Sequence, residues 1–147
     1  MSARDPHAVA QACAAAMWAE DSASRGLGME LLEVGPGTAT IAMTITAAMV
    51  NGHGTCHGGF IFTLADSAFA FACNAYDERT VAQHCSITFL KPGRLGDRLV
   101  ARAVERTRAG RSGIYDVAVR TAAGEPVAEF RGHSRSIGGA ILAAPAG

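Results

Sequence analysis

The sequence predicts an α+β fold in which an antiparallel sheet curves around one long helix. The chain of 147 residues is long enough for one domain with a sizeable core and too short for a second domain of similar size. Two strand-like segments precede, and four follow, a helical segment that is apolar on nearly its whole circumference. Such a helix has to be buried, so we expect the strands to wrap around it. One domain should therefore occupy residues 1–147.

The first elements are a helix and a pair of strands. The segment DPHAVAQACAAAMWAE predicts a helix over about residues 6–19, with Asp5 as N-cap and Pro6 at the first helical position. Residues 28–34 (GMELLEV) and 38–45 (TATIAMTI) are each strand-like, and a Gly-Pro-Gly turn joins them. We therefore expect these two strands to pair.

The second half of the chain repeats the strand signal four times. The segments are TVAQHCSITFL, DRLVARAVERT, GRSGIYDVAVRT and EPVAEFRGHSRSI, and the turn sequences KPGRLG, RAG and AAG separate them. They predict four consecutive antiparallel strands. The tail, about residues 140–147, has neither strand nor helix signals and is expected to be flexible.

Charge and cysteine usage exclude several classes of protein. Thirteen Lys and Arg balance thirteen Asp and Glu, so the chain lacks the basic excess of a nucleic-acid binder. No apolar run is long enough for a membrane span, and the first residues do not read as a signal peptide. The four cysteines form no CxxC pair and do not resemble a disulfide framework. These observations favour a soluble, cytoplasmic protein that binds neither nucleic acid nor membranes.

The central helix is expected over about residues 57–76 and carries one narrow polar stripe. The stripe consists of Thr63, Asp66, Ser67 and Asn74. Desolvating the Asp66 carboxylate costs on the order of several kcal/mol unless the group is paired, hydrogen-bonded or neutralised. Two interpretations are open: an ion pair with an arginine from the strands, or a functional carboxylate.

Two glycines, Gly58 and Gly59, lie at the start of this helix, where each costs up to about 1 kcal/mol relative to alanine. They let a ligand approach the backbone closely, and free N–H groups at a helix N-terminus stabilise an oxyanion or a phosphate. The alternative is a tight turn that needs a positive φ. Asp66 lies about 10 Å beyond Gly59 along the helix axis, too far for both to serve one carbon atom. If both act together, Asp66 comes from a second subunit of a two-fold dimer.

The loop before the helix, NGHGTCHGG, holds further polar residues. His53, Cys56 and His57 could form a metal site or a cysteine nucleophile with its base, but the loop offers no clear fourth ligand. We therefore expect no metal, and we expect His57 to orient the loop by hydrogen bonds. Asn51 either forms an Asx turn or reaches a substrate carbonyl. A P-loop and a GxSxG nucleophile elbow are both missing from the sequence.

The sequence NGHGTCHGGFIFTLADSAFAFACN resembles the hotdog-fold acyl-CoA thioesterases, most closely the PaaI type of phenylacetate pathways. The segments FLKPGRLGD and RGHSRSIGG are similar to that family too, so the resemblance covers about residues 20–139. It implies a hotdog fold, a curved antiparallel sheet wrapped around one long central helix. It also implies homodimers with a continuous sheet that assemble into homotetramers, with the active site at the subunit interface.

By position, the resemblance implies that Asp66 is the catalytic carboxylate and that the Gly58 amide polarises the thioester carbonyl. The residues implied near the substrate are Asn51, His57, Gly59 and Ser67. The implied reaction is hydrolysis of an aromatic acyl-CoA, such as phenylacetyl-CoA or a hydroxyphenylacetyl-CoA, to the free acid and CoA without a cofactor. Candidates by charge alone for binding the CoA phosphates are Lys91, Arg94, Arg108, Arg111 and Arg131. The alternative function is a non-catalytic acyl-CoA binding or sensing protein of the same fold.

Overall fold

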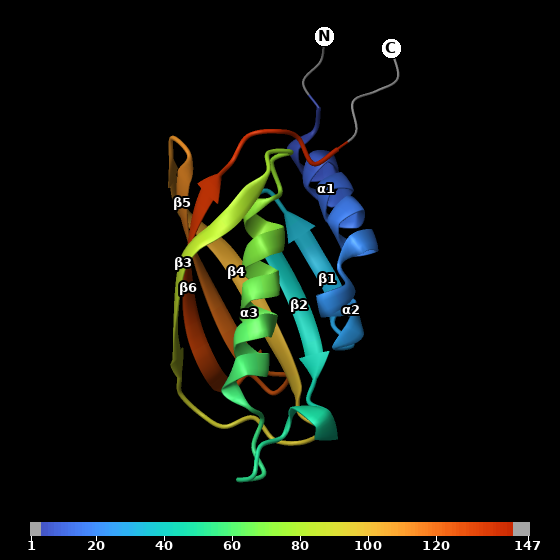
Figure 1. Cartoon of the computed structure of the whole chain (residues 1–147), viewed down its shortest axis with the longest axis vertical. Helices are drawn as coiled ribbons and strands as arrows, with labels where there is room; N and C mark the ends of the chain where they lie inside the picture. Colours follow the sequence, from blue (N-terminus) through green and yellow to red (C-terminus); the bar gives the residue numbers. More distant parts are fainter. Residues whose placement is uncertain (1–3, 143–147) are drawn as a thin grey trace.

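The computed structural model describes residues 4–142, which form one curved antiparallel sheet with a long helix inside its curve (Figure 1). The helices are α1 (Pro6–Glu20), α2 (Ser22–Gly26), the short 3-10 helix η1 (Ala47–Met49) and α3 (Gly58–Cys73). The strands are β1 (Glu30–Gly35), β2 (Thr38–Thr44), β3 (Thr80–Phe89), β4 (Arg98–Ala109), β5 (Ser112–Thr121) and β6 (Pro126–Ser136). Within residues 4–142, none of the helices has the length and apolar character needed to cross a membrane.

The strands lie in the order β1-β2-β4-β5-β6-β3, and every neighbouring pair is antiparallel. β1 pairs with β2, and β4, β5 and β6 follow one another as expected. β3 departs from the expected succession, because it pairs with β6 at the far edge and not with β4. The reason is α3, which crosses the concave face between β2 and β3 and so delivers the chain to the opposite edge (Figure 1). The connection from β3 to β4 then returns past the start of α3, where Thr55 bridges Arg94.

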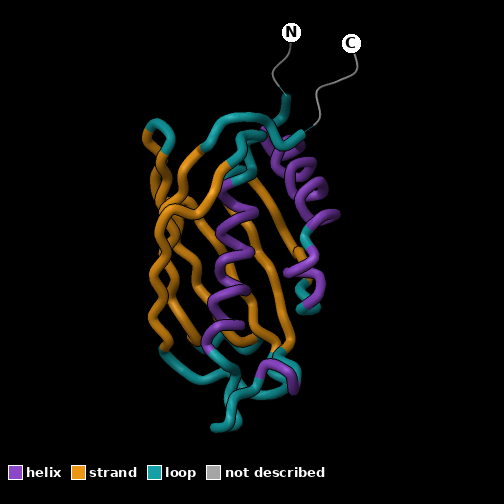
Figure 2. Tube along the Cα trace, in the orientation of Figure 1, coloured by secondary structure: helices purple, strands orange, loops and turns teal. Residues whose placement is uncertain are grey.

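The core lies between α3 and the concave face of the sheet, which curls around the helix (Figure 2). The buried side of α3 carries Leu64, Ala68 and Phe69, each at most 1% exposed. Gly132 of β6 permits this close packing, because a Cβ there would lie only 2.7 Å from the Phe69 ring. The expectation of a helix buried by the sheet is therefore confirmed on this side. Of the polar stripe, Thr63, Asp66 and Ser67 are half-buried, whereas Asn74 is buried.

α1 and α2 lie beside β1 and α3 (Figure 1). Asp5 caps α1 by accepting the Ala8 N–H at 3.3 Å, and Pro6 opens the helix. α1 ends at Glu20, because Asp21 (φ −87°, ψ 84°) turns the chain and caps α2 by accepting the Ser24 N–H at 2.8 Å. The sequence pattern did not predict the short helix α2.

α3 is shorter than the expected 57–76, because both ends are capped by side chains. His57 caps its start, and Asn74 caps its end. The Asn74 side chain accepts the Thr80 N–H at 2.9 Å and donates to the Thr80 carbonyl at 3.0 Å, which fixes the start of β3 against the end of α3. Of the expected flexible tail, residues 143–147 lie outside the described residues.

Candidate active site

The loop before α3 is held by Asn51. Its side-chain oxygen accepts the N–H groups of His53 at 2.9 Å and Thr55 at 3.3 Å, and the Thr55 hydroxyl at 3.3 Å. These bonds agree with the Asx turn, one of the two interpretations of this residue. They fix the path of the chain into α3.

His57 orients the first turn of α3. Its backbone N–H donates to the Met49 carbonyl at 2.7 Å, and its ring Nδ1 accepts the Gly59 N–H at 2.9 Å. The ring also packs edge-on against Phe60, with centroids 6.1 Å apart. His57 thus makes the orienting hydrogen bonds that we expect of it, and the Gly59 amide is already engaged within the protein.

Gly58 leaves its amide free at the first position of α3. No acceptor among residues 4–142 bonds to its N–H, and the helix dipole gives this end a partial positive charge. The alternative of a positive φ is wrong for Gly58 and Gly59, since neither has one. Close approach explains Gly58 instead, because a Cβ there would lie 2.9 Å from the Phe89 ring. With Lys91, Gly58 lines a cavity of about 480 Å³.

Asp66 is half-buried in the middle of α3. Burial raises the pKa of its carboxyl group above the usual range, because desolvation disfavours the charged form. Within residues 4–142 no salt bridge reaches it. Four of the strand arginines pair with other carboxylates instead: Arg98 with Glu30, Arg108 with Glu105, and Arg106 and Arg131 with Asp116. The ion-pair interpretation of Asp66 is therefore wrong.

The two hydroxyl groups of the polar stripe, those of Thr63 and Ser67, both have hydrogen-bond partners within the protein. The Thr63 hydroxyl donates to the Gly59 carbonyl at 2.8 Å. The Ser67 hydroxyl shares a hydrogen bond of 2.8 Å with the hydroxyl of Ser24, which in turn donates to Asp21 at 2.7 Å. Ser24 is 1% exposed and joins α2 to α3 beside Asp66. The sequence analysis did not identify Ser24 as a site residue. The one feature of the sequence that points to it is Asp21, an N-cap residue three positions earlier.

The structure groups the candidate residues at two places on α3. Asn51, His57, Gly58 and Gly59 lie together at its start, whereas Asp66 and Ser67 lie about 12 Å further along its axis. Burial and then the nearby Asp66 charge raise the pKa of the Cys85 thiol, so Asp66 lies near the middle of β3. β3 pairs with β6 on one side only and forms an edge of the sheet.

Cys56 and His53 are the remaining members of the loop cluster. Burial raises the pKa of the Cys56 thiol, which donates to the His57 carbonyl at 3.6 Å and so remains protonated at neutral pH. His53 is exposed on the loop. In the part of the chain that the structure describes, no three His, Cys, Asp or Glu side chains are placed to hold a metal ion.

Comparison with known proteins identifies the family. Residues 53–128 match the family described as the Thioesterase superfamily. The chain is 44% identical over 126 residues to the acyl-coenzyme A thioesterase PaaI of Escherichia coli, an alignment that covers 86% of this chain and 90% of that protein. A putative esterase of Deinococcus radiodurans is 44% identical over 108 residues, which cover 72% of this chain and 73% of the relative.

Solved structures agree with this assignment. The structure of the E. coli PaaI protein from the phenylacetic acid degradation operon superposes with a TM-score of 0.91 at 42% identity, covering 92% of this chain and 99% of that one. The TT0310 protein of Thermus thermophilus superposes with a TM-score of 0.77 at 39% identity, covering 80% and 99%. The chain therefore belongs to the thioesterase superfamily and is a thioester hydrolase with the hotdog fold.

Proposed function

We propose that the protein hydrolyses acyl-CoA thioesters, with the Asp66 carboxylate of one subunit and the Gly58 amide of another acting on one carbonyl group. The observation that carries this proposal is a half-buried carboxylate without an ion-pair partner within residues 4–142. Burying such a group lowers the stability of the fold, because the charge loses its hydration. Carboxyl groups with shifted pKa values concentrate at functional sites. The name of the E. coli relative, acyl-coenzyme A thioesterase PaaI, supports the same reaction.

The free Gly58 amide is proposed to polarise the thioester carbonyl by donating a hydrogen bond to its oxygen. A backbone N–H at a helix N-terminus stabilises the negative charge that develops on the thioester oxygen. Asn51 and His57 hold this end in place, the Gly59 backbone borders the substrate, and Ser67 fixes α3 beside the carboxylate. Asp66 acts either as a general base on water or as a nucleophile that forms a mixed anhydride. Both roles start from the ionised carboxylate.

The acyl group is proposed to be aromatic, as in phenylacetyl-CoA or a hydroxyphenylacetyl-CoA, and the products are the free acid and CoA. The origin of E. coli PaaI in a phenylacetic acid degradation operon supports this class. Lys91 lines the Gly58 cavity, so it is placed best to bind a CoA phosphate. Arg108 and Arg131 are less suited, because each already pairs with a carboxylate.

A two-fold dimer through β3 is the proposed assembly. β3 is an edge strand with Val81 45% and Phe89 51% exposed, and an exposed apolar edge favours pairing with another strand. Antiparallel pairing with the same strand of a second subunit would extend the sheet and bring the two α3 helices side by side. The start of one helix would then approach the middle of the other, giving two equivalent sites. Two dimers are proposed to form a tetramer.

The proposed compartment is the cytoplasm, and no cofactor is invoked. The cysteines within residues 4–142 are all free thiols, in keeping with a reducing environment. A carboxylate, a backbone amide and water are sufficient for the proposed chemistry.

The test is release of CoA thiol from acetyl-, palmitoyl-, phenylacetyl- and 4-hydroxyphenylacetyl-CoA by the purified protein and by Asp66→Asn. We expect turnover of the aromatic substrates and a fall of about 100-fold or more in kcat for Asp66→Asn, the scale for loss of an acid-base or nucleophilic group. Size-exclusion chromatography checks that the variant keeps its assembly. Activity of Asp66→Asn within a few-fold of the parent would contradict the catalytic role of Asp66. Binding of acyl-CoA without turnover by the parent would favour the non-catalytic alternative.

A further inference from the structure

Phe89, the last residue of β3, lies directly against the start of α3. A Cβ placed on Gly58 would lie 2.9 Å from Cζ, 3.2 Å from Cε1 and 3.3 Å from Cε2 of the Phe89 ring. These three ring atoms are the nearest neighbours that such a Cβ would meet. The first residue of α3 therefore presents a bare Cα to the outer edge of an aromatic ring, and glycine is what permits this approach.

The position of Phe89 in β3 directs its ring toward α3. Successive side chains of a strand point to opposite faces of the sheet. Cys85 and Ile87, four and two positions earlier, both pack against the core beneath α3. Phe89 continues this face of the strand, and its pairing with Ala128 of β6 fixes where along the helix the ring lies.

The Phe89 ring is also open to solvent on its other side. Its exposed fraction is 51%, whereas the other five phenylalanines of the chain are buried or half-buried. Phe89, Gly58 and Ile61 together line the cavity of about 480 Å³. One wall of this cavity is thus an aromatic ring that borders the free Gly58 amide.

We infer that Phe89 shields the Gly58 amide from water and thereby strengthens the hydrogen bond that this amide donates to the thioester oxygen. Water competes with the carbonyl oxygen for a free N–H, and an apolar ring beside the N–H excludes water from that side. A hydrogen bond to a developing negative charge is stronger where water is excluded. Phe89 acts through Gly58 and is a positioning residue. The inference rests on the proposed acyl-CoA hydrolysis.

Hydrogen exchange of the Gly58 amide, measured by NMR on the isotope-labelled full chain, tests the shielding without any substrate. The main variant is Phe89→Leu, because leucine keeps an apolar side chain but lacks the Cζ and Cε atoms that lie nearest Gly58. Residue 89 is distant from Gly58 in the sequence, so the substitution leaves the intrinsic exchange chemistry of the amide unchanged. We expect exchange in Phe89→Leu to be about tenfold faster than in the parent.

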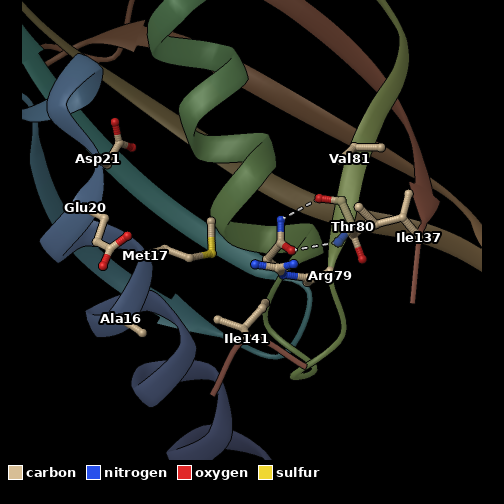
Figure 3. A pocket seen from close by; sticks show the side chains of 10 residues that line it. Ala16, Met17, Glu20, Asp21, Arg79, Thr80, Val81, Ile137 and Ile141 are labelled. Carbon is tan, nitrogen blue, oxygen red and sulfur yellow. Dashed lines mark hydrogen bonds between the residues drawn. The ribbon is translucent and has the colours of Figure 1, made fainter. Parts of the chain in front are cut away.

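Val81→Ala is the control for a change at the same edge strand. Val81 is the exposed apolar residue at the other end of β3. It lines a different cavity, between α1 and the segment that follows β6 (Figure 3), which shares no lining residue with the cavity beside Gly58. Val81→Ala should therefore leave the exchange rate of the Gly58 amide unchanged.

Turnover of phenylacetyl-CoA tests whether the shielding serves the reaction. Phe89→Leu should lower kcat about tenfold, less than the roughly 100-fold to 1,000-fold loss that follows removal of an oxyanion donor. Leu95→Ala, at an exposed position outside the residues that line the cavity, should leave kcat unchanged. Native mass spectrometry and thermal unfolding check that each variant keeps its assembly and its fold.

Gly58→Ala breaks the same contact from the side of the helix. Its Cβ displaces the Phe89 ring but keeps the N–H, so kcat should fall by a similar factor. Because both substitutions remove one contact, the double variant of Gly58→Ala and Phe89→Leu should be no less active than either single variant. Losses that multiply in the double variant would contradict a shared contact.

The two measurements separate failure of this inference from failure of the proposed function. If the parent releases no thiol, the proposed hydrolysis fails, and the exchange rates still decide whether Phe89 shields Gly58. An exchange rate in Phe89→Leu within about twofold of the parent rate overturns the inference. A parental kcat in Phe89→Leu together with faster exchange also overturns it, because the shielding would then not serve the reaction.

Discussion

At the scale of single residues, the burial of Asp66 links activity and stability to pH. Because its pKa is raised in the folded protein, protonation removes the reactive carboxylate at a higher pH than for an exposed aspartate. We expect kcat/KM to fall with decreasing pH along an acid limb whose midpoint lies above about 3.9, the ordinary pKa of Asp. A pH–rate profile measures this midpoint. A limb at or below the ordinary value would contradict the role of Asp66.

The raised pKa of Asp66 also predicts how the stability of the fold changes with pH. A carboxyl group with a raised pKa favours folding only while it is protonated, and this contribution is lost as the pH rises through the folded-state pKa. At pH 7 to 8 the ionised Asp66 therefore destabilises the fold, and Asp66→Asn should raise Tm. The difference should disappear in acid, below the ordinary Asp pKa. Calorimetry over this range checks the sign, and a lower Tm of Asp66→Asn at neutral pH would contradict it.

His57 is expected to contribute through its cap and not through its charge. His57→Ala removes the acceptor of the Gly59 N–H and should lower the free energy of unfolding by about 1 kcal/mol. His57→Asn is the matched control, because asparagine is a preferred N-cap and keeps an acceptor. Urea unfolding of the two variants measures the difference. Equal losses for both would mean that His57 acts by packing against Phe60.

At the scale of elements, Ser24 ties α2 to the part of α3 that carries Asp66. It is buried, and its hydroxyl connects Asp21 with Ser67. Ser24→Ala should lower the unfolding free energy by about 1–3 kcal/mol, because a buried partner loses its hydrogen bond. Ser22→Ala, at an exposed position of the same helix, is the control. If Ser24→Ala unfolds at the parental urea concentration, this link is not stabilising.

Elements whose signals are local could be predicted from the sequence. The N-cap and Pro6 of α1, the alternation in the strands and the apolar character of α3 each depend on neighbouring residues. The position of β3 could not be predicted in this way, because its pairing with β6 depends on how α3 crosses the sheet. The same holds for Ser24, whose partner Ser67 lies 43 residues away. The candidate site shows the same division: Asp66 stands out in an apolar helix, whereas Gly58 and Lys91 share a cavity only in the folded chain.

At the scale of the whole molecule, the two candidate catalytic groups of one chain lie too far apart to act on the same carbonyl group. The Gly58 amide and the Asp66 carboxyl lie eight residues apart on α3, about 12 Å along its axis. A carbonyl held by the first is out of reach of the second, so a single subunit should be inactive. In the proposed dimer, a second subunit paired through the exposed edge of β3 would remove this separation, because it would present its own Gly58 to the Asp66 of the first.

Complementation between two inactive variants tests the shared site. Gly58→Pro removes the N–H at the first helical position, and His57 (φ −59°, ψ 131°) already has a conformation that suits the residue before proline. Because any Cβ at this position displaces the exposed Phe89 ring, Gly58→Ala, which adds a Cβ and keeps the N–H, is the matched control. When Gly58→Pro and Asp66→Asn subunits carry different tags and are mixed, each heterodimer has one site with both lesions and one with neither. We expect about half of the parental activity per heterodimer if the sites act independently, from two parents that are nearly inactive. Native mass spectrometry confirms the heterodimer, and thiol release measures its activity. Verified heterodimers that stay inactive would show that both groups serve the carbonyl from within one chain.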